Sequence, residues 1–215
     1  MTLLAIDTSG PFCSAALVSL SGERLADISE EIGRGHAERL MPMLEEVLRE
    51  VGKVWADVER IAVVRGPGSF TGLRVGLAAA RGLALACNIP AQGVTAFEAL
   101  AFYDGGVGTI ALDARRGEVW FQKFAEGLPV SEPMALSVSD CLAQLESGER
   151  VIGSGAPILI DSGAKIDVVS HIPSPPILAV ANAALVAQEI IEANPLYLRA
   201  PDAKPQTPLA QNGAK

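Results

Sequence analysis

The sequence predicts an α/β fold of two lobes, each built from a mixed β-sheet covered by helices. Of its 215 residues, 49% are hydrophobic but only 5% are aromatic, a composition that suits packed layers of Ala, Val and Leu. Short apolar runs alternate with longer segments of helical periodicity. The pattern begins again after Asp104-Gly105-Gly106, which predicts a first lobe of residues 1–104 and a smaller second lobe of residues 105–200.

Five short strands are expected in the first lobe. Residues 3–8, 14–20 and 25–30 are separated only by turn residues, which predicts an antiparallel meander. Two further apolar runs, at residues 61–64 and 91–94, are each followed by a helical segment. This alternation of strand and helix is typical of parallel strands in a layered α/β lobe.

Gly33 and Gly35 introduce the first helix. Apolar residues then recur at helical spacing with charged residues on the other side, which predicts an amphipathic helix over residues 36–51. Pro42 removes a backbone donor inside this segment, so we expect a kink or a start near Met41. The apolar positions are Leu40, Met43, Leu44, Val47, Leu48 and Val51.

A glycine-rich loop, residues 65–76, connects the strand at 61–64 to an apolar helix over residues 73–87. Gly66 and Gly68 permit tight turns and close approach of another group. A loop of this kind before a helix is a common place to hold an anion, and a strand-to-helix turn without a ligand explains it equally well. The loop lacks the Lys and Ser/Thr of a P-loop and the spacing of a dinucleotide fingerprint.

The helix over residues 73–87 is apolar almost all the way round, so it must be covered on more than one side. Its own chain could cover it, or it could form a protein–protein surface with the helix over residues 36–51. We favour the second interpretation, in which four helices meet across a two-fold axis. The predicted contact residues are His36, Leu40, Met43, Leu44, Val47, Leu73, Arg74, Leu77 and Arg81.

In the second half, strands are expected at residues 109–113, 118–124 and 150–152. A helix is expected near residues 139–145, and a long Ala-rich helix from about residue 177 to residue 193. The first of these strands ends in an aspartate and a turn, as the first strand of the chain does. This echo supports a duplicated lobe.

Asp7, Thr8 and Ser9 form a polar turn at the end of a buried strand, and Asp113 has the matching place in the second half. Two such turns facing each other across a cleft would make a nucleotide site of the actin and sugar-kinase type. Local hydrogen bonding within each turn explains the same residues without a ligand. We therefore expect no required cofactor, and at most weak nucleotide binding at residues 7–9.

Metal and nucleophilic chemistry find little support. The two histidines, His36 and His171, lie far apart and have no Cys or carboxylate neighbours at ligand spacing. No G-x-S-x-G nucleophile elbow occurs. The formal charge of −8 argues against a chain that grips nucleic acid by itself, because phosphate neutralisation needs clustered Lys and Arg. We expect no catalytic residue and no metal site.

The sequence also indicates a soluble, cytosolic protein. Its three cysteines are widely spaced and are expected to be reduced core residues. Asp7 interrupts the opening apolar run, so no secretory signal is recognisable. The apolar segment 73–87 carries two arginines and is shorter than the roughly 20 residues that span a bilayer. Residues 201–215 have almost no large apolar side chains, and we expect them to be disordered.

Five segments stand out in the chain. They read LAIDTS at residues 4–9, GHAERLMP at 35–42, RGPGSFTGLRVG at 65–76, ALDARRGEV at 111–119 and PLYLR at 195–199. In this order they resemble the TsaB family of bacterial proteins, which is needed for threonylcarbamoyladenosine in tRNA. The resemblance covers residues 3 to about 200. It implies an actin-like (ASKHA, ribonuclease H-like) fold of two lobes.

The catalytic paralog of this family, TsaD, carries an H-x-x-x-H metal motif on the helix that follows the glycine-loop helix. Ala96 and Leu100 would fall where those two histidines belong, and neither side chain can bind a metal. The resemblance therefore implies that this chain is not an enzyme. It would be a partner subunit of the tRNA N6-adenosine threonylcarbamoyltransferase.

The resemblance also implies partners. The family pairs with TsaD through first-lobe helices, and the ATPase TsaE works with the pair. The complex transfers a threonylcarbamoyl group to the adenosine next to the anticodon of tRNAs that read codons beginning with A. The chain alone would form a homodimer through the same helices, would meet tRNA only within the complex, and would have no membrane contact.

Two alternatives stay open. One is an ATP-dependent kinase or ATPase of the actin-like fold, which would need an adenosine pocket in the second lobe. The segment Gly153-Ser154-Gly155-Ala156 is the only Gly-rich candidate for it. The other is a peptidase, and the missing histidines argue against that activity.

Overall fold

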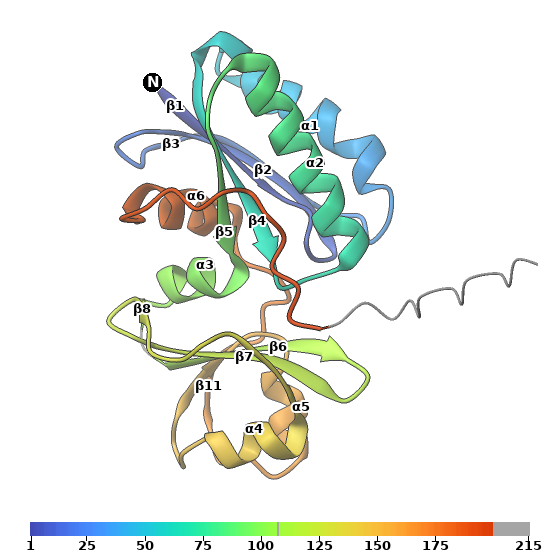
Figure 1. Cartoon of the computed structure of the whole chain (residues 1–215), viewed down its shortest axis with the longest axis vertical. Helices are drawn as coiled ribbons and strands as arrows, with labels where there is room; N and C mark the ends of the chain where they lie inside the picture. Colours follow the sequence, from blue (N-terminus) through green and yellow to red (C-terminus); the bar gives the residue numbers. More distant parts are fainter. Residues whose placement is uncertain (107, 200–215) are drawn as a thin grey trace, which may run out of the picture.

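The computed structural model describes residues 1–106 and 108–199, and these residues form two lobes stacked along the long axis of the molecule (Figure 1). Each lobe contains a mixed β-sheet with helices packed on it, so the predicted α/β fold is confirmed. The tail over residues 201–215, for which disorder is predicted, lies outside the described residues.

The first sheet has the strand order β3-β2-β1-β4-β5. The strands β1 (Thr2–Asp7), β2 (Phe12–Ser19) and β3 (Arg24–Glu31) pair antiparallel, which confirms the predicted meander. The strands β4 (Val58–Gly66) and β5 (Ala91–Thr95) continue the sheet parallel to β1. Because β1 lies in the middle of a sheet covered on both faces, all six of its residues are buried, as its continuous apolar run requires.

Helices cover both faces of this sheet (Figure 1). The helices α1 (His36–Glu50) and α2 (Phe70–Cys87) lie on one face. On the other face lies α6 (Ile177–Val186), with α3 (Ala96–Tyr103) packed against it. Pro42 lies inside α1, which begins at His36, so the alternative start near Met41 is wrong. A short 3-10 turn precedes β4.

The second sheet repeats the centre of the first. Its strand β6 (Gly108–Arg115) pairs antiparallel with β7 (Glu118–Ala125) and parallel with β10 (Arg150–Ile152), as β1 pairs with β2 and β4. The topology therefore confirms the predicted duplication. The remaining elements are β8 (Leu128–Pro129), β9 (Met134–Ser137), α4 (Val138–Gln144), α5 (Ala156–Asp161) and β11 (Asp167–Ser170).

The C-terminal part of the chain returns to the first lobe, so the predicted second lobe of residues 105–200 is too long. Val180 of α6 is fully buried in the same core as the strands of the first sheet. Beyond α6, the N–H of Leu196 donates to the carbonyl of Arg65 at 2.7 Å. The helix predicted over residues 177–193 ends at Val186. The second lobe is therefore formed by β6 to β11 with α4 and α5.

Candidate functional site

The turn at the end of β1 is buried and internally bonded. Asp7 is 1% exposed, and its carboxylate Oδ1 accepts the N–H of Ser9 at 2.7 Å. Burial raises the pKa of Asp7 to about 6, against the opposing effect of the hydrogen bond from Ser9. Thr8 is 2% exposed, and its hydroxyl donates to the carbonyl of Gly72 at 2.7 Å.

The start of α2 lies directly on this turn. A Cβ at Gly68 would come within 2.6 Å of the Ser9 carbonyl oxygen, and a Cβ at Gly72 within 2.0 Å of the Thr8 carbonyl oxygen. A Cβ at Gly76 would come within 2.6 Å of the Thr8 hydroxyl. Gly68 lies in the loop before the helix, and Gly72 and Gly76, four residues apart, make one side of the helix flat enough to contact backbone. Close packing therefore explains the glycine pattern of the loop.

The turn at the end of β6 has the same hydrogen bond but lies open. The N–H of Arg115 donates to Asp113 Oδ1 at 2.7 Å, and the N–H of Asp113 donates to the Ser154 hydroxyl at 3.1 Å. The Gly-rich segment predicted as a nucleotide-pocket candidate packs here, because a Cβ at Gly153 would meet the Ala111 carbonyl oxygen at 2.5 Å. The Asp113 side chain stays 22% exposed.

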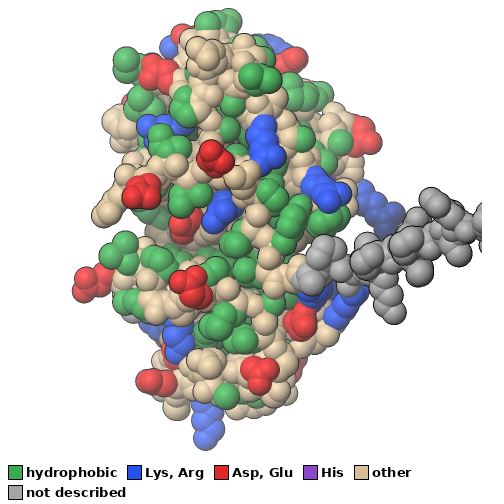
Figure 2. Space-filling model, in the orientation of Figure 1, with side chains coloured by type: hydrophobic (Ala, Val, Ile, Leu, Met, Phe, Trp, Pro, Cys, Tyr) green, Lys and Arg blue, Asp and Glu red, His purple; other side chains and the backbone are tan. Residues whose placement is uncertain are grey.

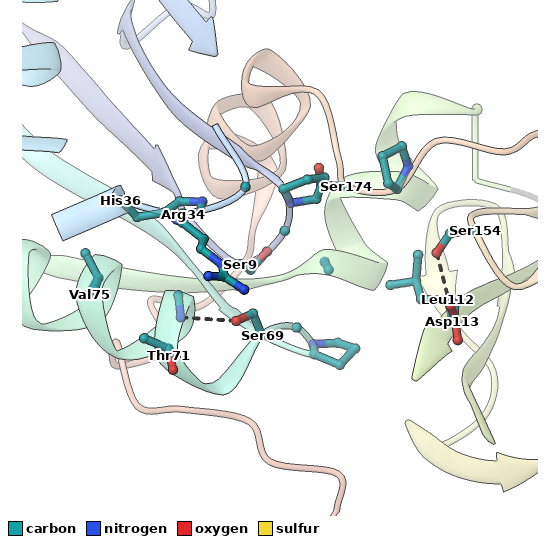
Figure 3. Close-up of a pocket in the computed structure, with 18 of the residues that line it drawn as sticks. Ser9, Arg34, His36, Ser69, Thr71, Val75, Leu112, Asp113, Ser154 and Ser174 are labelled. Atoms are coloured by element: carbon teal, nitrogen blue, oxygen red, sulfur yellow. Dashed lines mark hydrogen bonds between the residues drawn. The ribbon is translucent and has the colours of Figure 1, made fainter. Parts of the chain in front are cut away.

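A cleft of about 950 Å³ separates the two lobes at these turns. Figure 3 shows Ser9, Arg34, His36 and Ser69 on the side of the first lobe, and Asp113 with Ser154 on the opposite side. The two strand ends therefore face one cleft, which is the arrangement that a nucleotide site of the actin and sugar-kinase type would need. Asp7 and Thr8 do not line it, so of the three residues predicted to bind a cofactor only Ser9 reaches the cleft.

Most of the predicted partner contacts are corrected by the structure. A side chain packed on the sheet cannot also meet a partner, and six of the nine residues are between 0% and 3% exposed. These six are Leu40, Met43, Leu44, Val47, Leu73 and Leu77. Arg74 and Arg81 are exposed. His36 is half-buried, and its Nε2 has no hydrogen-bond partner among the described residues.

The exposed side of α2 also includes residues that were not predicted as partner contacts. Only 28% of the helix is buried, and Leu85 is 85% exposed. Ala78, Gly82 and Ala86 are also exposed. The helix has 18 residues, longer than predicted, and its length and composition would suffice to cross a bilayer. The glycine spacing could have identified the buried side, because the side opposite Gly72 and Gly76 must face outward.

The positions predicted to correspond to a metal motif lie at the start of α3. Ala96 is 1% exposed and borders the cleft, and Leu100 is fully buried. Over the described ranges, 1–106 and 108–199, no group of three His, Cys, Asp or Glu side chains is placed to hold a metal ion.

Comparisons with known proteins agree with this architecture. The family described as "TsaD: tRNA N6-adenosine threonylcarbamoyltransferase" matches residues 28–204. An uncharacterised protein of Mycobacterium tuberculosis is 34% identical over 210 residues, which cover 95% of this chain and 94% of that protein. The tRNA threonylcarbamoyladenosine biosynthesis protein TsaB of Bacillus subtilis is 32% identical over 160 residues, covering 71% of this chain and 69% of that protein.

Among solved structures, YeaZ from Pseudomonas aeruginosa superposes with a TM-score of 0.75 at 29% identity, over 92% of this chain and 99% of YeaZ. Together with the duplicated strand topology, these matches confirm the predicted two-lobe actin-like fold.

Proposed function

This chain belongs to the TsaB family of tRNA threonylcarbamoyladenosine biosynthesis proteins, and we propose that it acts there as a non-catalytic scaffold that binds and activates TsaD. In this proposal it contributes no catalytic group and needs no cofactor of its own. TsaE joins the pair, tRNA is met only within the complex, and the chain works in the cytoplasm.

The exposed side of α2 carries the proposal. Leu85 has the largest exposed fraction among the exposed large apolar side chains of the described residues. Gly82 lies one turn and Ala78 two turns before it toward the helix start, and their small size lets another helix approach closely. Burying a leucine contributes about 1.5–3 kcal/mol, so this surface favours a partner.

The partner that fits is a helical surface of related fold. The exposed side of α2 carries Arg74 and Arg81 two turns apart, whereas α1 beside it carries several glutamates. A second pair of helices with the same arrangement would place opposite charges across a two-fold axis. A second copy of this chain meets this condition, and we propose that TsaD, whose family model matches this chain, takes the same place in the complex.

The test compares two exposed apolar residues on opposite faces of the first lobe. Leu85→Glu should weaken binding to purified TsaD at least about tenfold, measured by calorimetry. The reason is that a charge would replace a leucine that the proposed complex buries. Val186→Glu is the matched control, since Val186 is 65% exposed at the end of α6 and should leave affinity unchanged. Circular dichroism should show that both variants are folded.

Three results would contradict the proposal. Equal affinity of both variants for TsaD would remove α2 as the contact surface. Modified tRNA formed by this chain alone, with adenylate donor and metal supplied, would show that it is an enzyme, and ATP turnover by the isolated chain would favour a kinase or ATPase.

A further inference from the structure

Three segments that are distant in the sequence meet at a second cavity, which we name the arginine–aromatic groove. It is lined by the start of α2 at Phe70, by Arg115 and Arg116 of the β6–β7 hairpin, and by Tyr197 and Arg199. Its volume is about 510 Å³. Of the residues used for the proposed contact with TsaD, only Arg74 lies beside this groove, because the groove is at the first turn of α2, away from Leu85.

The aromatic rings of the groove are half open to solvent. Phe70 is 47% exposed and Tyr197 is 43% exposed, with their ring centroids 5.3 Å apart at an angle of 40°. The guanidinium carbon of Arg74 lies 3.8 Å from the Phe70 ring centroid, which is cation–π geometry. Exposed rings beside arginines are suited to stacking on the flat face of a nucleobase.

Hydrogen bonds and an ion pair hold the charged residues Arg115 and Arg199 in place at the edge of the groove. Arg115 has a left-handed backbone (φ 63°) that the N–H bond to Asp113 fixes, and its side chain is 85% exposed. The guanidinium of Arg199 donates to the Ala114 carbonyl at 3.1 Å and pairs with Glu118. The hairpin is therefore rigid, while the Arg115 head group stays available to an anion.

The groove is basic although the whole chain is acidic, at a formal charge of −8. Among the described residues Arg74 makes no ion pair, and Arg115 pairs with Asp113 through a side chain that is itself 85% exposed, so water screens this pair from the Arg115 side. Figure 2 shows several Lys and Arg side chains on the right of this face, near the junction of the lobes. Positive charge in an otherwise acidic chain favours a polyanionic ligand.

We propose that the arginine–aromatic groove binds unpaired nucleotides of the tRNA, with bases stacked on Phe70 and Tyr197 and phosphates paired with Arg74 and Arg115. This rests on the proposed function, which supplies tRNA as the RNA. An acidic protein segment would satisfy the arginines but would leave the rings without a stacking partner, so RNA fits more of the groove. Only a few phosphates can pair with the arginines of this groove, so the chain alone should bind tRNA weakly. Within the complex, other subunits hold the same tRNA, and the groove then adds to the overall affinity.

The experiment measures tRNA affinity of the complex with TsaD by fluorescence anisotropy at several salt concentrations. Arg115→Glu should weaken tRNA binding at least about fivefold and reduce the slope of log K against log salt by about 1. Tyr197→Ala should weaken binding by a similar factor without changing the slope, because it removes stacking only. Arg24→Glu is the matched control, since it makes the same charge change on the distant strand β3.

The outcomes separate the groove from the proposed function. If the wild-type complex forms and modifies tRNA, but all three variants bind tRNA equally, the groove proposal alone is wrong. If Arg115→Glu instead loses TsaD or TsaE and keeps tRNA affinity, the groove binds protein and the proposal is also overturned. If no complex with TsaD forms at all, the proposed function fails, and the groove proposal fails with it.

Discussion

The turns at the ends of β1 and β6 have the same local geometry and opposite surroundings. In each, an aspartate Oδ1 accepts the N–H two residues further on at 2.7 Å. Asp7 is nevertheless 1% exposed, whereas the side chain of Asp113 is 22% exposed. The difference comes from the helix that follows the neighbouring parallel strand. In the first lobe this helix is the 18-residue α2, and in the second it is the six-residue α5.

This comparison shows how a duplicated motif can take two roles. In the first lobe Gly72 and Gly76 let α2 close over the turn, which becomes a packed joint that orients the helix. In the second lobe the corresponding close contact is between Gly153 and the Ala111 carbonyl, two residues before Asp113. Asp113 is therefore left uncovered on the wall of the cleft. A buried joint can position a partner-binding helix rigidly, and an open turn can still meet a ligand.

The largest effect is expected where the joint is tightest. Gly72→Ala should destabilise the chain by more than about 3 kcal/mol, because its Cβ would lie 2.0 Å from a backbone carbonyl oxygen. Gly82→Ala on the exposed side of α2 is the control, since nothing lies within 4 Å, and it should stabilise by about 0.5–1 kcal/mol. Urea unfolding followed by circular dichroism measures both. If Gly72→Ala lowers the free energy of unfolding by less than about 1 kcal/mol, the close packing of α2 on the first turn is contradicted.

Burial of the Asp7 carboxyl predicts that the stability of the folded chain depends on pH. The folded chain holds the Asp7 proton more tightly than the unfolded chain, since the pKa rises from 3.8 to about 6. Stability from this group is therefore present below pH 4, falls as pH rises to about 6, and stays lower above it. At about 1.4 kcal/mol per unit the loss is about 3 kcal/mol.

Asp7→Asn keeps the Oδ1 acceptor and cannot ionise, so it should be more stable than the wild type at pH 7.5 by up to about 3 kcal/mol and similar at pH 4. Asp113→Asn should change stability by less than about 1 kcal/mol at either pH, because its ion-pair partner Arg115 is 85% exposed to solvent. Thermal melts across this range test both. A wild-type stability that rises between pH 4 and 6 relative to Asp7→Asn would reverse the sign and refute the argument.

Much of this arrangement was predictable from the sequence, because strands and turns leave local signals. The apolar run before Asp7 and its echo before Asp113 identified both central strands and the two-lobe duplication. The side of α2 that faces solvent was not identified, because Arg74 and Arg81, seven residues apart, are the only charged residues that mark it. The four-residue spacing of Gly72 and Gly76 was a second signal for the buried side, whereas Gly82 faces outward, so a single small residue does not orient the helix.

Other errors come from contacts between distant segments. The helix α6 follows the second lobe in the chain but packs on the first, and no local pattern in residues 177–186 encodes that return. Short elements such as β9 and α5 were missed because four to six residues carry little periodicity. The groove at Phe70 and Tyr197 depends on the same chain return, so only its separate motifs could be read from the sequence.

The smallest expected change in stability comes from removing one hydroxyl at each turn, that of Thr8 at the first and that of Ser154 at the second. Thr8→Val removes a buried hydrogen bond to the Gly72 carbonyl and should cost about 1.5 kcal/mol, since water cannot replace the lost donor. Ser154→Ala removes the acceptor of the Asp113 N–H at the cleft wall, where water can take its place, and should cost about 0.5 kcal/mol. Chemical denaturation of both variants under one condition gives the difference. Equal costs would mean that water reaches the two turns alike, and the contrast between a closed joint and an open cleft wall would then not describe their energetics.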